Sequence, residues 1–236
     1  MKKNDDIILI CAVGRSASTT LQRILNTIPN SNICGENWGA VNDLLRFYLN
    51  IKKSTFCNIP GGENPKSYES LITSRIKPMW YNSYDYGEMV EHIKLLITKM
   101  FKKTEDTSVW GFKEIRYMSK SEDPNDGDIE LISAFRELFP QTKVILHIRD
   151  DTKRQSKSGW WRGNWKKFGG DSEKFLTDLN DEFRKFHHKN KDFTYLSTFD
   201  DMLDVDKVQD IFEYVGCPES FDKDEIRNIL NNRFKR

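Results

Sequence analysis

The sequence lacks several features that would assign a chain to a class at once. Its four cysteines, among 236 residues, form neither a Cys-x-x-Cys pair nor the Cys and His spacing of a zinc site. No apolar run approaches the roughly 18 residues of a membrane span, and the run at residues 7–13 is too short and acid-flanked for a signal peptide. We therefore expect free thiols, no metal, no membrane association and a cytoplasmic location.

An excess of charge of one sign is also missing. Lys and Arg number 37 against 36 Asp and Glu, a formal net charge of +1, so there is no bulk attraction to nucleic acid or acidic lipid. The charge is nevertheless uneven. Residues 149–167 hold seven basic and two acidic side chains, a net of +5, whereas residues 168–236 hold eleven basic and sixteen acidic, a net of −5. A polyanion site must therefore be local, and we expect no nucleic-acid partner.

The patterning that is present predicts alternating strands and helices. With 37% hydrophobic and 12% aromatic residues, the chain can form one domain over residues 1–236 with a substantial core. Continuous apolar runs are typical of strands buried on both faces of a parallel sheet. We expect strands at residues 7–13, 31–34, 109–112, 143–148 and 193–196. We expect helices at residues 39–51, 67–76, 86–102, 128–138, 152–161, 171–189, 204–215 and 222–233.

This alternation favours an α/β fold with a doubly wound parallel sheet flanked by helices. Residues 57–100 add an insertion of helix and loop, which contains an aromatic cluster at residues 80–86 and is a candidate substrate lid. The C-terminal part of the chain forms a helical tail.

The segment after the first predicted strand has the composition of an anion-binding loop. Residues 14–20 lie between that strand and a helical pattern, and ligands bind beyond the carboxyl ends of parallel strands. The loop offers four hydroxyl groups, one guanidinium and a turn of N–H donors, which suit a tetrahedral anion. It lacks the lysine of a Walker A motif, which argues against hydrolysis of nucleoside triphosphates. The alternative is that its Ser and Thr residues only cap the helix.

A second anion site is predicted where the strand at residues 143–148 ends. Arg149 is the first residue beyond this buried strand and opens the basic segment. Two anion sites at two strand ends indicate a ligand phosphorylated at both ends. Ser156 and Ser158 are both candidates to partner Arg149. On one helix they lie about 200° apart, so only one of them can face the phosphate.

Four blocks, in order, resemble sulfotransferases of the bacterial and tyrosylprotein-sulfotransferase type. RSASTTL at residues 15–21 resembles their 5′-phosphosulfate loop, and RD at 149–150 with SGWW at 158–161 resembles their 3′-phosphate motif. CGEN at 34–37 and WGFKEIR at 110–116 resemble the blocks between. The resemblance implies a P-loop-like fold that binds 3′-phosphoadenosine 5′-phosphosulfate (PAPS), transfers its sulfuryl group without a metal and releases 3′-phosphoadenosine 5′-phosphate (PAP).

The resemblance also implies individual roles. Glu36 would be the base that takes the acceptor proton, and Lys113 and Arg15 would stabilise the leaving group; otherwise Glu36 caps a helix and Lys113 is a surface lysine. His147 is a second candidate base, although its place inside a strand favours a buried structural role. Ala17 stands where the family has glycine, so a left-handed backbone there would be strained. The implied cofactor-binding residues are Arg15, Ser16, Ala17, Ser18, Thr19, Thr20, Arg149 and Ser158.

Two other functions remain open at this stage. A P-loop-type small-molecule kinase would need the missing loop lysine, and a non-catalytic RNA-binding module could use the basic stretch with its tryptophans. A transferase should lose activity on Glu36→Gln or Lys113→Ala, whereas a binding module should not. The acceptor hydroxyl could belong to a sugar, a phenol or a tyrosine, on a small molecule, glycan or peptide. Trp160, Trp161 and Trp165 could line the adenine or acceptor pocket or pack in the core, and the oligomeric state is open.

Overall fold

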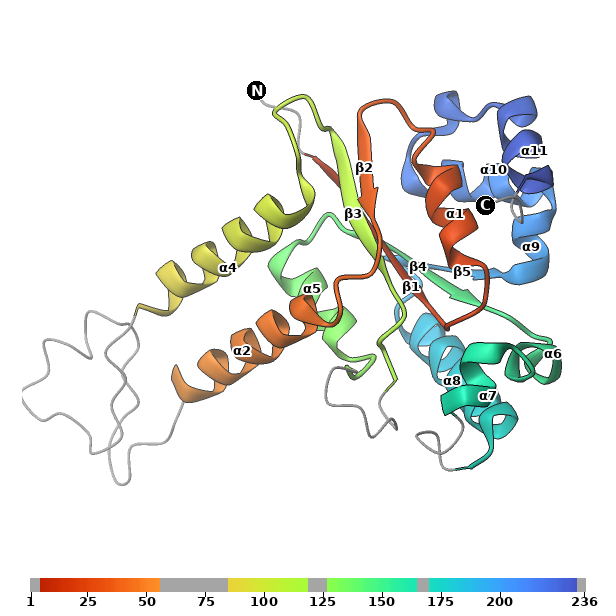
Figure 1. The fold of residues 1–236 in the computed structure, drawn as a ribbon. Coiled ribbons are helices and arrows are strands. Elements are labelled where there is room, and N and C mark those ends of the chain that lie inside the picture. Colours follow the sequence, from red (N-terminus) through yellow and green to blue (C-terminus); the bar gives the residue numbers. More distant parts are fainter. Residues whose placement is uncertain (1–4, 56–84, 119–126, 165–169, 233–236) are drawn as a thin grey trace, which may run out of the picture.

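A five-stranded sheet runs through the computed structural model, which describes residues 5–55, 85–118, 127–164 and 170–232 (Figure 1). The strands lie in the order β2-β3-β1-β4-β5, and every pairing between neighbours is parallel. This confirms the predicted α/β fold with its parallel sheet. The strands are β1 (Asp6–Ala12), β2 (Ser31–Cys34), β3 (Val109–Glu114), β4 (Lys143–Ile148) and β5 (Thr194–Thr198).

Helices cover both faces of this sheet (Figure 1). One face is covered by α1 (Ser18–Leu25), α9 (Phe199–Leu203), α10 (Val205–Val215) and α11 (Lys223–Asn231), with the short 3₁₀ helix η2 (Pro218–Ser220) between the last two. The other is covered by α2 (Ala40–Thr55), α4 (Tyr86–Phe101), α5 (Leu131–Leu138) and α8 (Ser172–Lys189). The helices α6 (Thr152–Ser156) and α7 (Gly159–Asn164) follow β4. None of these described helices is long and apolar enough to cross a membrane.

The central strand β1 explains why the sheet needs two helical layers. Its side chains alternate between the two faces, and Ile7 and Leu9 join one apolar cluster while Ile8 and Ile10 join the other. All four side chains are buried. Because an apolar residue points to each face in turn, the sheet can exclude water only when helices pack on both sides.

Most predicted elements lie within a few residues of the observed ones, with one clear exception. The single helix predicted at residues 152–161 is wrong, since the chain forms α6 and α7 with a break at Lys157 and Ser158. The Ser158 amide closes α6 by donating to the Gln155 carbonyl, and α7 starts at Gly159, a poor helix former in this position. The helix predicted at residues 67–76 lies outside the described residues, as does most of the predicted insertion.

The C-terminal part of that predicted insertion contributes to the core. Helix α4 buries Ile93, Ile97 and Phe101. The Phe101 ring stacks on Phe112 of β3 with 4.6 Å between ring centroids. This helix therefore belongs to the layer that covers the sheet.

The parallel arrangement brings five strand ends to one edge of the sheet. Gly14 follows β1, Glu36 follows β2, Lys113 lies near the end of β3, Arg149 follows β4 and Phe199 follows β5. In open α/β sheets this carboxyl edge is where ligands bind, because loops and helix N-termini converge there.

Gly111 tests how closely β1 and β3 pack. A Cβ atom at this position would lie 1.7 Å from the backbone oxygen of Ile8, which neither strand can move to relieve. We expect Gly111→Ala to lower the free energy of unfolding by about 4 kcal/mol or more, or to prevent folding. Chemical denaturation checks this. Gly163→Ala is the control, because nothing lies within 4 Å of its added carbon; equal effects of the two substitutions would contradict the prediction.

Candidate functional site

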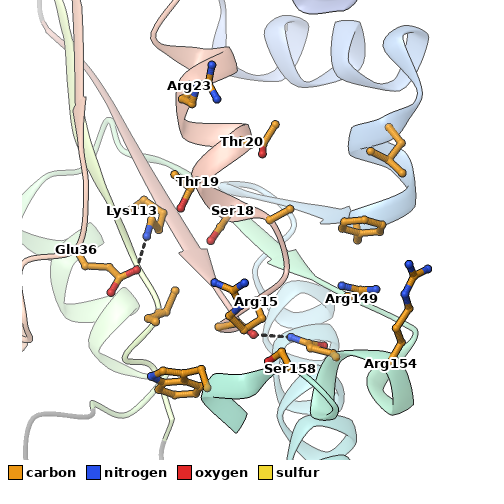
Figure 2. Close-up of a pocket in the computed structure, with 17 residues that line it drawn as sticks. Arg15, Ser18, Thr19, Thr20, Arg23, Glu36, Lys113, Arg149, Arg154 and Ser158 are labelled. Atoms are coloured by element: carbon orange, nitrogen blue, oxygen red, sulfur yellow. Dashed lines mark hydrogen bonds and ion pairs between the residues drawn. The ribbon is translucent and has the colours of Figure 1, made fainter. Parts of the chain in front are cut away.

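A cavity of about 960 Å³ opens at the carboxyl edge of the sheet (Figure 2). Its volume falls in the range of roughly 300–1,000 Å³ that is usual for small-molecule sites. Of the implied catalytic and cofactor-binding residues, all but Ser16 line it. The lining consists of Gly14, Arg15, Ala17, Ser18, Thr19, Thr20, Arg23, Glu36, Lys113, Ile115, Arg149, Arg154, Gln155, Ser158, Trp160, Phe199 and Leu203.

The loop between β1 and α1 has a strained backbone. Arg15 and Ala17 have φ values of 67° and 68°, in the left-handed region that favours glycine. The positive φ at Ala17 confirms the strain expected from alanine in place of glycine. Ala17 is the N-cap of α1 and provides no side-chain cap. The first N–H groups of a helix have no partner within it, so an anion at this end of α1 finds donors there.

Buried side chains hold the loop by its carbonyl groups. The Gly14 oxygen accepts hydrogen bonds from Gln155 Nε2 at 2.7 Å and from Trp161 Nε1 at 3.0 Å. The Ser16 oxygen is 2.9 Å from His147 Nε2. All three of these side chains are buried. Side chains from the interior therefore bind carbonyl oxygens of the loop. The opposite side of the loop faces the cavity with backbone N–H groups and with the hydroxyls of Ser18 and Thr19.

His147 is a structural residue in this arrangement. A carbonyl oxygen can only accept, so Nε2 carries the proton that is donated to Ser16, and Nδ1 accepts from the Ser197 hydroxyl at 3.1 Å. Burial lowers the pKa of His147 to about 4, which keeps the ring neutral at physiological pH. Since the ring is fully buried and does not line the cavity, its position favours the structural interpretation over the role of a base.

One end of the cavity is formed by an ion pair between Lys113 and Glu36 (Figure 2). The Lys113 Nζ atom lies 2.5 Å from Glu36 Oε1. The lysine side chain is 5% exposed and that of the glutamate 34%. Lys113 is therefore not a surface lysine, and Glu36 is the member of the pair that a molecule arriving from solvent can reach.

Glu114, the next residue of β3, holds the segment that carries Glu36. Its buried carboxylate accepts from the Asn37 amide at 3.1 Å and from the Ile115 amide at 2.8 Å. Burial raises its pKa, although these two N–H donors act in the opposite direction. Two successive residues of β3 thus bind two successive residues after β2: the Lys113 ammonium group binds the Glu36 carboxylate, and the Glu114 carboxylate accepts from the Asn37 amide. The sequence block contained Glu114, but nothing in it indicated this role.

The other end of the cavity contains Arg149 (Figure 2). Its guanidinium lies over the Phe199 ring, 4.4 Å from the centroid, and burial lowers its pKa. Among the described residues, buried Arg149 Nε and Ser158 Oγ have no hydrogen-bond partner. Ser156 instead donates its hydroxyl to the Lys153 carbonyl and does not line the cavity. The break between α6 and α7 is what places Ser158, and not Ser156, at the cavity.

The structure adds lining residues that sequence reasoning missed, chiefly Arg23, Arg154 and Phe199. Arg23 could have been found, because it lies one helical turn beyond Thr19 on α1. The lining therefore contains five cationic side chains, those of Arg15, Arg23, Lys113, Arg149 and Arg154, and one carboxylate, that of Glu36. Such a lining attracts anions strongly.

The tryptophans divide between cavity and core. Trp160 lines the cavity, whereas Trp161 is fully buried and contributes its indole N–H to the loop. Trp165 lies outside the described residues. Within the described ranges, no group of three or more His, Cys, Asp or Glu side chains could hold a metal ion.

No protein-family model matches the sequence, and no curated protein matches it either. Three solved structures align with almost all of this chain: sulfotransferases from Alicyclobacillus acidocaldarius, Mycobacterium avium (STF9) and Mycobacterium tuberculosis (STF1). Their TM-scores are 0.48, 0.49 and 0.47, with 13%, 13% and 12% identity. The alignments cover 98%, 99% and 98% of this chain and 92%, 70% and 72% of theirs. This similarity is too low to transfer a function, which must follow from the site itself.

The left-handed backbone at Ala17 generates a stability prediction. Glycine adopts a φ of 68° without the steric cost that alanine incurs, so Ala17→Gly should raise the free energy of unfolding by up to about 1 kcal/mol. Thermal or chemical denaturation checks this. Gly216→Ala is the matched opposite case: its φ is +84° and its surroundings are open, so it should lose a similar amount. Destabilisation by Ala17→Gly would show that the loop is not strained there.

His147 makes stability depend on pH. Its pKa in the folded protein is about 4, below the ordinary value of 6.5. Between these two pH values the histidine is protonated in the unfolded chain and neutral in the folded protein. The free energy of unfolding should therefore fall as the pH drops through this window, by up to about 1.4 kcal/mol per pH unit from this group. Urea titrations of wild type and His147→Gln at pH 7, 6, 5 and 4 measure it. Parallel curves for the two proteins would contradict the assignment.

Proposed function

We propose that this protein is a PAPS-dependent sulfotransferase that transfers a sulfuryl group to an acceptor hydroxyl. The observation that carries the proposal is the layout of one cavity. A reachable carboxylate paired with a buried lysine lies at one end, an arginine and a serine with unpartnered buried atoms lie at the other, and the hydroxyl-rich loop connects them. A nucleotide with phosphate groups at its 3′ and 5′ positions has the matching anions at its two ends.

The described residues fit this donor. Arg149 Nε and Ser158 Oγ are buried polar atoms without partners, a state that is costly unless a ligand supplies acceptors. They would hold the 3′-phosphate. Arg15, the hydroxyls of Ser18 and Thr19 and the N-terminus of α1 would hold the 5′-phosphosulfate. Trp160 at the cavity wall offers an aromatic face for the adenine base.

The Lys113 and Glu36 pair then supplies the groups that the chemistry needs. When bound, PAPS would supply the sulfuryl group and would leave as PAP with added negative charge on its 5′-phosphate. Glu36 would take the proton of the acceptor hydroxyl as the new S–O bond forms. Lys113 and Arg15 would neutralise the charge that develops on the departing oxygen as the old S–O bond breaks. As in phosphoryl transfer, these residues mainly position the reactants and stabilise charge.

Binding of PAP tests the donor assignment without knowledge of the acceptor. In calorimetric titration without metal, wild type should bind PAP more tightly than adenosine 5′-monophosphate, which lacks the 3′-phosphate. Arg149→Ala should weaken PAP binding by about 2–3 kcal/mol, because it removes a charge-assisted contact and leaves a phosphate unpaired. It should leave the affinity for adenosine 5′-monophosphate nearly unchanged.

Lys153→Ala is the matched control for Arg149→Ala. It removes an exposed cation from α6 that does not line the cavity, so PAP affinity should stay close to that of wild type. Equal losses of PAP affinity in both variants would show that Arg149 acts only through its positive charge and makes no specific contact with the phosphate. Tighter binding of ATP with magnesium than of PAP would favour the kinase alternative, and binding of single-stranded RNA alone would favour the RNA-binding module.

A further inference from the structure

Trp38 combines two properties that are unusual for a large aromatic residue. Its side chain is 75% exposed, the largest exposed fraction among the large apolar residues described. Its φ is 57°, in the left-handed region that bulky residues avoid. Strained backbone conformations of this kind persist only where the surroundings over-determine them, and they cluster at functional sites.

The contacts on either side of Trp38 hold its backbone in this conformation. The preceding amide, of Asn37, donates to the buried Glu114 carboxylate at 3.1 Å. The Asn37 side-chain oxygen accepts from the Val41 amide at 3.0 Å and so caps the start of α2. The chain must turn between these two anchors, and Trp38 occupies the turn.

Arg116 covers one face of the indole ring. Its guanidinium carbon lies 4.7 Å from the ring centroid, within the range of cation–π contacts. The Arg116 Nε atom is also 3.9 Å from the Glu114 carboxylate, so the same buried acid that holds the turn attracts the cation beneath the ring. The ring is therefore supported on one side, and its high exposure leaves apolar surface available to a ligand.

The backbone of Trp38 lies close to the end of the cavity that contains Glu36 and Lys113. Glu36, which lines the cavity, precedes Trp38 by two residues, so their Cα atoms are at most about 7.6 Å apart. Arg116 directly follows Ile115, another lining residue. Trp38 and Arg116 do not line the cavity themselves, but each lies within two residues of a lining residue at the end where Lys113 and Glu36 form their ion pair.

We propose that Trp38 is the platform on which the acceptor stacks, and that the acceptor carries its hydroxyl on a ring with an apolar face. A phenolic ring and a pyranose ring share this chemistry, since both can lie flat on an indole. A hydroxyl on such a ring would be within reach of the Glu36 carboxylate two residues away. This assignment rests on the proposed sulfotransferase function and adds the acceptor side of the same site.

Trp38→Gly separates a binding role from a structural one. Glycine removes the ring and tolerates the φ of 57°, so this variant should be at least as stable as wild type in thermal denaturation. The PAP-saturated protein is titrated by calorimetry with 2-naphthol and, separately, with methyl β-D-glucopyranoside. We expect wild type to bind one of them, Trp38→Gly to bind it at least tenfold more weakly, Trp38→Phe to retain most of the affinity, and PAP affinity to stay within twofold in both variants.

Leu95→Ala controls for loss of an exposed apolar side chain, because Leu95 is 50% exposed on α4 and does not line the cavity. It should bind the probes as wild type does. Preference for naphthol or for the glucoside identifies the ring class. The proposal is overturned if wild type with PAP binds neither ring, or if Trp38→Gly binds them unchanged. Failure of wild type to bind PAP would instead contradict the donor assignment, and probe binding that depends on Trp38 would still support the platform.

Discussion

The site depends on the way in which the interior holds the carbonyl groups of the β1–α1 loop. A loop that is to bind an anion must present its N–H groups outward, and its carbonyl oxygens must then be satisfied from within. Here Gln155 and Trp161 both donate to the Gly14 oxygen, and His147 donates to that of Ser16. Each donor is buried, so water does not compete for these bonds.

The same contacts join the two ends of the cavity. Gln155 belongs to α6 and Trp161 to α7, and Ser158 lies in the break between those helices. The bonds to Gly14 that orient the loop therefore also fix the segment that places Ser158 in the lining of the cavity. At the opposite end, β3 holds the residues after β2 through Lys113 and Glu114. Because β1 lies between β3 and β4, one rigid sheet spaces both ends.

Backbone strain is concentrated at this edge of the molecule. Of the four described non-glycine residues with positive φ, Arg15 and Ala17 lie in the loop and Trp38 follows Glu36 by two residues. The fourth, Asn30, belongs to a residue type that tolerates this conformation and stands in a turn before β2. Buried acceptors and donors hold the three less tolerant residues in place. This pattern is expected where the placement of side chains matters more than a low conformational energy of the backbone.

The sequence by itself determined the sheet and most helices, because continuous apolar runs and helical periodicity are local signals. It also predicted nine of the seventeen residues that line the cavity, since these follow predicted strands or lie in the blocks of family resemblance. The helical pattern alone could not choose between Ser156 and Ser158, although the resemblance favoured Ser158, because it predicted one continuous helix where the chain forms α6 and α7. Nor could it reveal Glu114, whose role depends on a neighbour 77 positions away along the chain. Only the tertiary structure decided these points, because parallel pairing joins residues whose spacing in sequence carries no periodic signal.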